Sequence, residues 1–325
     1  MAELNMIQAL NLAMKEALEA DPNVVILGQD VGVDGGIFRA TVGLIEAFGP
    51  ERVIDTPLAE SGILGMSIGM CFNGLRPVAE IQFSGFSYQG FHQMENHAAR
   101  FRWRTRGRFS VPMVARMPYG AGVRALEHHS ESREAYYAHT PGLTMVVPSG
   151  PRKARALLAA AIADPDPVVF YEPKALYRAF REEVPDAPET LPLGQAEVVR
   201  TGRDITMIAY GAMLPRTLAA AEELDKEGVQ AEVIDLMTIS PLDEATIVAS
   251  VRRTGRALVV HEAAMSFGPG AEVCARIIDK AFFELEAPVK RVTGYDLHPP
   301  YFAREQHYLP SVSRIVDEAR ETLSM

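Results

Sequence analysis

The sequence has little cysteine, no long apolar run and no excess of positive charge. Its 325 residues include only Cys71 and Cys274, too few for a disulfide framework or a cysteine-rich zinc site. No apolar stretch reaches the length of a bilayer-spanning helix. The formal net charge of −10 argues against non-specific nucleic-acid binding, because such binding depends on basic surfaces that neutralise phosphates. We therefore expect neither a membrane protein nor a nucleic-acid-binding protein.

The first residues do not read as a targeting segment. The opening MAELNMIQALNLAMKEAL is interrupted by acidic residues and is followed by no cleavage site, unlike a secretory signal peptide. A hydrophobic content of 48% and a charged content of 23% are typical of a folded globular protein. The length is sufficient for two domains. These features together predict a two-domain cytoplasmic enzyme.

Strand and helix patterns alternate along the first half of the chain. Asn5 can cap a helix in which apolar residues recur at helical spacing, and 24–27 reads as a buried strand. Further strands are expected at 52–55, 76–83, 111–117, 143–147 and 167–171, with helices after 56, over 88–102 and over 152–163, the last opened by Ser149 and Pro151. Such alternation predicts an α/β fold with a parallel sheet covered by helices on both faces.

The segment REEVPDAPETLPLG, residues 181–194, is rich in proline and acid and predicts a linker. We expect a first domain at 1–183, a linker at 184–194 and a second domain at 195–325. Strands of the second domain are expected at 205–209, 231–236, 257–260 and 289–292. This half offers no catalytic constellation, and we expect His261, Glu262 and His298 to be structural or interfacial.

The stretch VIDTPLAESGILGMSIG, residues 53–69, is the candidate functional centre. Proline breaks the strand, and Glu60 then stands at the start of a helix, where free backbone amides favour an anion. Gly62, Gly65 and Gly69 lie close to one helical face and cost about 1 kcal/mol each relative to alanine. We expect that face to meet another element closely. Without further context, an alternative interpretation is that Glu60 merely caps the helix.

Longer motifs supply the context for Glu60. The segments GQDVGVDGGIFRATVGLIEAFGPERVIDTPLAESG, RPVAEIQFSGF, EHHSES, DPDPVVFYEPKALYR, ITMIAYGAM, VIDLMTISPLD and TGRALVVHEA extend over nearly the whole chain. Together they resemble the β subunit of the thiamine-diphosphate-dependent decarboxylating component of 2-oxo acid dehydrogenase complexes, especially the bacterial pyruvate dehydrogenase type. The resemblance implies two parallel-sheet domains of the transketolase-like type: a pyrimidine-binding domain, then a C-terminal domain used for dimerisation and partner docking.

The resemblance also implies roles for single residues. Glu60 would pair with the aminopyrimidine ring of thiamine diphosphate, and Phe86 would stack on that ring, with Gln82 and Leu58 beside it. A flat ring suits this place, because offset stacking adds about 0.5–1.5 kcal/mol to burial. From composition alone, Phe86 would be an ordinary core aromatic. His129, in the HS motif, would lie in the active centre.

Two other features could suggest metal or nucleic acid. Adjacent His128 and His129 lack a third ligand at zinc-like spacing, so we expect no zinc site. The segment 100–108, RFRWRTRGR, reads as a solvated or subunit-facing patch, since the net charge is negative. In some family members a structural potassium ion binds at positions that correspond to Met113, Ala161, Ile162, Asp164 and Asp166.

The chain departs from the family pattern at three positions. Gln29 replaces the usual Glu of a GEDVG motif, Glu131 replaces Gln or Asp, and Asp166 replaces Asn. A glutamine hydrogen-bonds but does not ionise near neutral pH. A proton relay that uses the acid at position 29 would therefore be weakened or rerouted here.

One absence bears directly on mechanism. No GDG motif, the usual mark of a diphosphate and magnesium site in this superfamily, occurs in the chain. The resemblance implies that an α subunit supplies that half of the site in an α2β2 heterotetramer. It further implies oxidative decarboxylation of pyruvate and reductive acylation of lipoyllysine on an acyltransferase component. Branched-chain 2-oxo acids or acetoin are alternative substrates, and a non-catalytic scaffold subunit is an alternative of another class.

Overall fold

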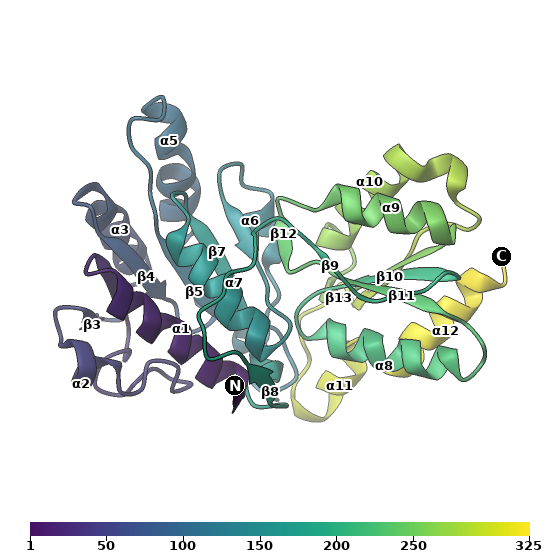
Figure 1. Ribbon diagram of the computed structural model, residues 1–325, viewed down its shortest axis with the longest axis horizontal. Helices are drawn as coiled ribbons and strands as arrows, with labels where there is room; N and C mark the ends of the chain where they lie inside the picture. Colours follow the sequence, from purple (N-terminus) through teal and green to yellow (C-terminus); the bar gives the residue numbers. More distant parts are fainter.

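The computed structural model describes residues 1–325 and shows two halves side by side, each built around its own sheet (Figure 1). A seven-stranded sheet has the order β12-β6-β7-β5-β4-β2-β3, and a five-stranded sheet has the order β14-β13-β10-β11-β9. A short two-stranded ribbon, β1-β8, lies near the N-terminus. The expected α/β architecture with two mainly parallel sheets is confirmed.

The first half supplies six strands of the larger sheet. Its elements are β1 (Ala2–Leu4), α1 (Met6–Ala20), β2 (Val24–Gly28), α2 (Leu44–Phe48), β3 (Val53–Asp55), α3 (Glu60–Phe72), β4 (Arg76–Glu80), α4 (Tyr88–His92), α5 (Phe101–Arg104), β5 (Val114–Tyr119), α6 (Glu134–Ala138), β6 (Thr144–Val146), α7 (Pro151–Ala163), β7 (Val168–Pro173) and β8 (Glu182–Val184). All strand pairs among β2 to β7 are parallel. The carboxyl ends of these strands therefore share one edge.

The second half forms the smaller sheet. Its elements are β9 (Glu197–Arg200), β10 (Ile205–Ala209), α8 (Met213–Asp225), β11 (Ala231–Asp235), β12 (Thr238–Ser240), α9 (Glu244–Thr254), β13 (Ala257–Ala264), α10 (Pro269–Ala281), β14 (Lys290–Gly294), α11 (Glu305–Tyr308) and α12 (Val312–Leu323). Four strands run parallel, and β9 adds an antiparallel edge. The residues of β10 are those that the sequence predicts.

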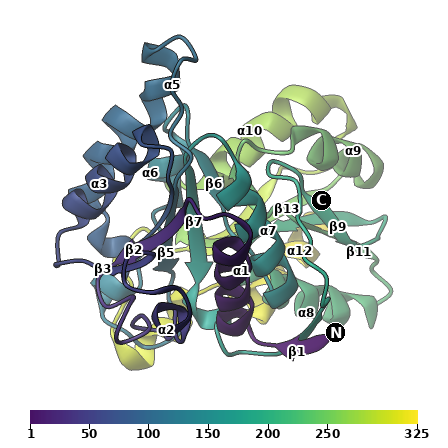
Figure 2. The ribbon, with the colours of Figure 1, turned by 60° about the vertical axis from the view of Figure 1, so that its left-hand side comes forward.

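Helices cover both faces of each sheet. Alternate residues of a strand point to opposite faces. In β2, Ile26 packs with α1 and α7, whereas Leu27 packs with α3 on the other face. Figure 2 shows α1 and α7 side by side, and an ion pair of 2.6 Å joins Arg155 to Glu16 across them. In the second half α8 and α12 cover one face, and α9 and α10 cover the other.

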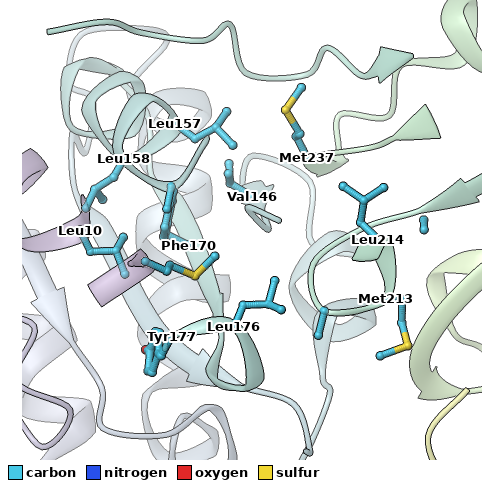
Figure 3. Packing of buried hydrophobic residues seen from close by; sticks show 14 of the residues in the cluster. Leu10, Val146, Leu157, Leu158, Phe170, Leu176, Tyr177, Met213, Leu214 and Met237 are labelled. Atoms are coloured by element: carbon cyan, nitrogen blue, oxygen red, sulfur yellow. The ribbon is translucent and has the colours of Figure 1, made fainter. Parts of the chain in front are cut away.

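The two halves share a sheet and a core. Strand β12 belongs to the second half by sequence, yet it pairs antiparallel with β6, with Thr238 opposite Val146. One continuous apolar cluster includes Phe170 of the first half and both Met213 and Met237 of the second (Figure 3). The sequence pattern does not predict β12, because three residues are too few to show a strand period.

The predictions for two helix N-termini and for the helix over 88–102 are confirmed only in part. Asn5 and Gln8 form the capping box of α1, with the Gln8 N–H donating to Asn5 Oδ1 at 3.0 Å. Ser149 does not cap α7, because its hydroxyl donates to Asp235 and Gly150 takes the N-cap place. The helix expected over 88–102 is wrong in detail: α4 passes through a π turn at 93–97 and a 3₁₀ turn at 98–100 into α5.

Two findings concern the features that the sequence lacks. Both cysteines are free thiols, and burial raises the pKa of Cys71 to about 12. No helix combines the length and the apolar character that crossing a membrane requires.

Candidate active site

The expected site residues gather where neighbouring parallel strands end. Glu60 follows β3, Gln82 and Phe86 follow β4, and His129 lies on the loop that follows β5. These strands and β2 are neighbours in the order β5-β4-β2-β3. Ligand sites in α/β sheets form at such carboxyl ends. The residues therefore share one edge of the larger sheet, although they are far apart in sequence.

Glu60 is a buried acid without a partner in the chain. It is the first residue of α3, its exposed fraction is 6%, and no other group hydrogen-bonds its carboxylate. It does not cap the helix, because no side chain accepts a hydrogen bond from the first turn. Its carboxyl oxygens are not among the buried polar atoms that lack a partner, so the carboxyl group reaches solvent at the edge of the sheet. The Glu60 carboxyl group is therefore available to a ligand or a partner chain.

The glycine face of α3 remains open within this chain. A Cβ atom added at Gly69 would meet nothing within 4 Å, and one at Gly65 would only touch Gln93 at 3.5 Å. The close approach occurs instead at Gly90 of α4, where a Cβ atom would lie 2.5 Å from Cδ1 of Leu64. The expected close contact at the α3 glycines is thus not made by another element of this chain.

Gln82 is held by Asp30, an acid that the motifs do not predict at the site. Its Nε2 donates to Oδ2 of Asp30 at 2.9 Å, across from the loop that follows β2. Asp30 has a positive φ of 60°, a strained conformation for a residue other than glycine. Its place directly after β2, next to Gln29, is the signal that could have revealed it.

Phe86 and His129 come together around a third ring, Phe83. The centroid of Phe83 lies 4.3 Å from that of His129 and 5.5 Å from that of Phe86, and the Phe86 and His129 centroids are 5.4 Å apart. All three pairs meet edge to face, a favourable arrangement for aromatic rings. Burial, with the nearby Lys174 charge, lowers the pKa of His129 below its usual value. The neutral imidazole is therefore favoured at pH 7.

The loop that carries His129, residues 120–131 and here called the histidine loop, is closed by hydrogen bonds at its two ends. The Gly120 N–H donates to the Glu131 carbonyl at 3.0 Å, and the Ser84 hydroxyl donates to that carbonyl at 3.1 Å. The Glu131 carboxylate accepts from the Tyr88 hydroxyl at 2.5 Å and from Arg133 at 2.7 Å. The acid at position 131 therefore has a defined place in an ion pair that anchors the loop.

A groove opens beside this loop. Its volume is about 820 Å³, and its walls include Glu127, His128 and Glu131 on one side and His298, Tyr301 and Arg304 on the other. The second half of the chain thus supplies one wall of the groove next to His129. His298, expected to be structural or interfacial, belongs to that wall. Leu58, in contrast, is 68% exposed and lies outside these contacts.

The positions matched to a potassium site surround the end of α7. Arg76 donates to the carbonyl oxygens of Ile162 and Asp164, both at 3.0 Å. The carbonyl of Met113 accepts from the Val168 N–H. The side chain of Asp166 pairs with Arg102 at 2.6 Å, on a patch where Trp103 is 88% exposed. Nowhere in the chain do three or more His, Cys, Asp or Glu side chains form a group suited to a metal ion.

Comparison with known proteins covers the whole chain. Residues 2–179 match the family model described as transketolase, pyrimidine binding domain, and residues 194–315 match transketolase, C-terminal domain. The chain is 49% identical over 323 residues to pyruvate dehydrogenase E1 component subunit beta of Bacillus subtilis (strain 168), covering 99% of each. It is 48% identical over 321 residues to the protein of that description from Acholeplasma laidlawii, covering 99% of this chain and 98% of the relative.

A solved structure described as split gene transketolase, inactive beta4 tetramer, has a TM-score of 0.80 at 23% identity, covering 99% of both chains. This likeness concerns the fold, and it confirms the transketolase-like arrangement of two α/β units. The full-length identity to the bacterial relatives confirms the family that the motifs indicate. The chain belongs to the family of pyruvate dehydrogenase E1 component beta subunits.

Proposed function

We propose that the chain is the β subunit of a pyruvate dehydrogenase (acetyl-transferring). Together with an α subunit, it carries out oxidative decarboxylation of pyruvate and transfers the acetyl group to lipoyllysine of an acyltransferase component. The observation that carries this proposal is the carboxyl group of Glu60, which has no partner within the chain and lies at the sheet edge that also holds Phe86 and His129. An acid that has no partner within the chain and reaches solvent can accept a ligand, which a merely scaffolding subunit would not need.

Thiamine diphosphate is the proposed cofactor, and it supplies a nucleophilic carbon that takes up the acyl group as carbon dioxide leaves. The residues of this chain suit its pyrimidine end. Glu60 can hold a proton at a ring nitrogen, Phe86 offers an aromatic face, and Gln82 is oriented by Asp30. Leu58 is exposed and free to make an apolar contact.

The diphosphate end is assigned to the partner subunit. Magnesium prefers oxygen ligands arranged around phosphate, and no acidic group of three or more side chains is offered here. We therefore propose an α2β2 heterotetramer in which the α subunit binds the diphosphate and magnesium. The open glycine face of α3, with Gly62 and Gly69 exposed, is suited to contact with that subunit.

His129 is assigned to the second half-reaction. It follows Glu127 and His128, which line the groove of about 820 Å³ between this loop and residues 298–304, and we assign that groove to the lipoyl arm. A histidine near neutrality can deliver a proton to a sulfur atom. Its lowered pKa makes this step favoured at mildly acidic pH.

The proposal also covers the domain organisation. We propose a first domain at 1–183, a linker at 184–194 and a second domain at 195–325 used for dimerisation and partner docking.

A potassium ion is proposed at the carbonyl oxygens around the end of α7. Each of these oxygens keeps a second lone pair beside the hydrogen bond that it already accepts. A higher melting temperature in potassium than in sodium chloride would support it. A cytoplasmic location agrees with two free thiols.

The proposal is tested with the assembled enzyme. The chain is co-purified with its α subunit, retention of thiamine diphosphate is measured by calorimetry, and a panel of 2-oxo acids is assayed with a lipoyl domain as acceptor. We expect cofactor retention and preference for pyruvate. Preference for branched-chain 2-oxo acids or for acetoin would change the substrate, and failure to retain the cofactor would favour a scaffold.

A further inference from the structure

The loop that carries His129 is tied to the second half of the chain through its backbone. This histidine loop, residues 120–131, begins after β5 and is closed by the hydrogen bond from Gly120 to Glu131. Gly120, Gly122 and Arg124 all have positive φ angles. Such a conformation is not self-supporting in a residue such as arginine and needs contacts that fix it.

Two buried carboxylates provide those contacts. The Ala121 N–H donates to Oε2 of Glu262 at 2.8 Å, and the Arg124 N–H donates to Oε2 of Glu305 at 2.9 Å and to its Oε1 at 3.2 Å. Glu262 lies on β13 and Glu305 begins α11, and both are buried. The loop backbone of the first half is therefore held by acids of the second half.

A buried ammonium group completes the arrangement. Lys174 donates to the Gly120 carbonyl and lies 5.8 Å from the ring centroid of Phe83. The imidazole of His129 packs against that ring. A Cβ atom at Gly120 would lie 2.7 Å from both carboxylate oxygens of Glu262, so only glycine permits the acid to approach the loop. Lys174, which lies beside the ring cluster, and Glu262, which holds the loop, therefore both contact Gly120 or its immediate surroundings.

The energetics favour a specific role for these acids. Both acids accept hydrogen bonds from backbone N–H groups of the loop, and burial raises the pKa of Glu262 above its usual value. Removing such an acceptor leaves a buried N–H unpaired, which costs about 1–3 kcal/mol. Because the unpaired group would be in the loop backbone, the loop would move before the core of either sheet yields. Local loosening of the histidine loop is then the expected consequence.

We propose that Glu262 and Glu305 are positioning residues that set the place of His129 through the backbone of the histidine loop. Neither acid lines the groove beside the loop; both act through Ala121 and Arg124. The second half of the chain thereby fixes the position of the loop that carries His129. This inference rests on the proposed function only where it concerns His129; the restraint of the loop is independent of it.

The restraint is measured by hydrogen–deuterium exchange on the full-length chain. In Glu262→Ala, amides of residues 120–131 should exchange at least tenfold faster, while those of the sheets change little. Glu262→Gln keeps an oxygen acceptor and should restore most of the protection. Glu232→Ala is the matched control, since Glu232 is a buried acid of β11 whose partners are Ser250 and Arg253, away from the loop.

Loop exchange that is unchanged in Glu262→Ala, or raised equally in Glu232→Ala, would overturn the restraint. If Glu262→Ala does not fold, Glu305→Ala takes its place, and faster amide exchange is then expected around Arg124. Glu262→Gln should also speed exchange in the loop, by a smaller factor. These readouts need no enzymatic activity, so they remain decisive even if the proposed reaction is incorrect.

The action on His129 is measured in the enzyme assembled with its α subunit. Glu262→Ala should lower acylation of a lipoyl domain more than tenfold and lower activity with an artificial electron acceptor less than threefold. Adding His129→Asn to Glu262→Ala should then cost less than a further twofold, because the two residues act through one group. Losses that multiply would overturn the positioning role. No effect of His129→Asn by itself would instead refute the role of His129 in the proposed function.

Discussion

Glu60 is the residue whose chemistry depends most on an absent partner. The residue as a whole is buried, but its carboxyl oxygens reach solvent and receive no hydrogen bond within the chain. We expect Glu60→Gln to preserve the shape of the pocket, to weaken cofactor binding modestly and to slow proton loss from the reactive cofactor carbon by orders of magnitude. Hydrogen–deuterium exchange at that carbon, in the assembled enzyme, measures the effect. Glu51→Gln, at an exposed acid before β3, is the control, and equal exchange rates in all three proteins would remove Glu60 from this role.

His129 belongs to the second half-reaction rather than to decarboxylation. His129→Asn should retain much of its rate with an artificial electron acceptor and lose most of its acylation of a free lipoyl domain. Because the pKa of His129 lies below its usual value, the protonated form grows as pH falls below 7. Lipoyl acylation should therefore rise on mild acidification in the wild type and not in the variant.

His139→Asn provides the matched control for this test. His139 is an exposed histidine at the end of α6, and it belongs neither to the groove nor to the ring cluster around Phe83. Equal losses in the two assays for His129→Asn would favour a structural role for the loop histidine.

For single residues, the sequence predicts those that belong to recognisable motifs. Glu60, Phe86 and His129 were expected at the site, and the structure puts Phe86 beside His129. Asp30 and Glu262 were not predicted as contacts of the site, because each acts across more than fifty residues of chain. A hydrogen bond of that kind depends on tertiary distances, which leave no periodic signal in a sequence.

Helix α3 contains a glycine, Gly69, that lowers helix stability although nothing in this chain packs closely against it. Gly69 lies in the helix interior with open space around it, so Gly69→Ala should stabilise the isolated chain by about 1 kcal/mol. Gly90→Ala should destabilise it by about 1–3 kcal/mol, because the new methyl group would meet Leu64 and the Glu60 carbonyl. Denaturant unfolding of both variants gives the comparison. Destabilisation by Gly69→Ala would show that this face is already covered.

Helix α6 carries a buried acid that favours its neutral form. Burial raises the pKa of Glu134 to about 8, and its Oε1 accepts from the Tyr210 hydroxyl at 3.3 Å. The unfolded chain releases this proton near pH 4.5 and the folded chain near pH 8, so stability is lost as pH rises through that window.

Glu134→Gln should abolish this loss, since the amide keeps the acceptor for Tyr210 and has no proton to release. The difference in unfolding free energy should be near zero at pH 4 and reach several kcal/mol by pH 8, at about 1.4 kcal/mol for each pH unit. Denaturant midpoints measured across this range test the prediction. Glu222→Gln, at an exposed acid of α8, serves as the control, and a constant difference at all pH values would contradict it.

At the element scale, sequence patterns predicted most strands and helices. They failed for the helix over 88–102, where π and 3₁₀ turns interrupt the helix. Here Gly90 and Leu64 bring α4 close to α3, and tertiary packing overrides the local helical pattern. They also failed at β12, which is a strand only because β6 offers it an edge.

The whole molecule is expected to fold alone and to be inactive alone. Its two sheets are covered on both faces and share a continuous core, so circular dichroism of the purified chain should show a cooperative transition. Decarboxylation should be undetectable without the α subunit, because the diphosphate and magnesium half of the site is assigned there. Turnover by protein rigorously freed of that subunit would refute the division of the site.

Strand β12 has a consequence for how this chain can be divided. A fragment that ends in the linker would leave β6 as an open edge, since β12 normally occupies that side of the sheet. Open edges of this kind pair readily with other chains and cause aggregation. The halves are therefore not interchangeable modules: recombination between relatives within the linker would separate β6 from the strand that closes its sheet. A graft of the first half remains intact only when residues 237–241 travel with it.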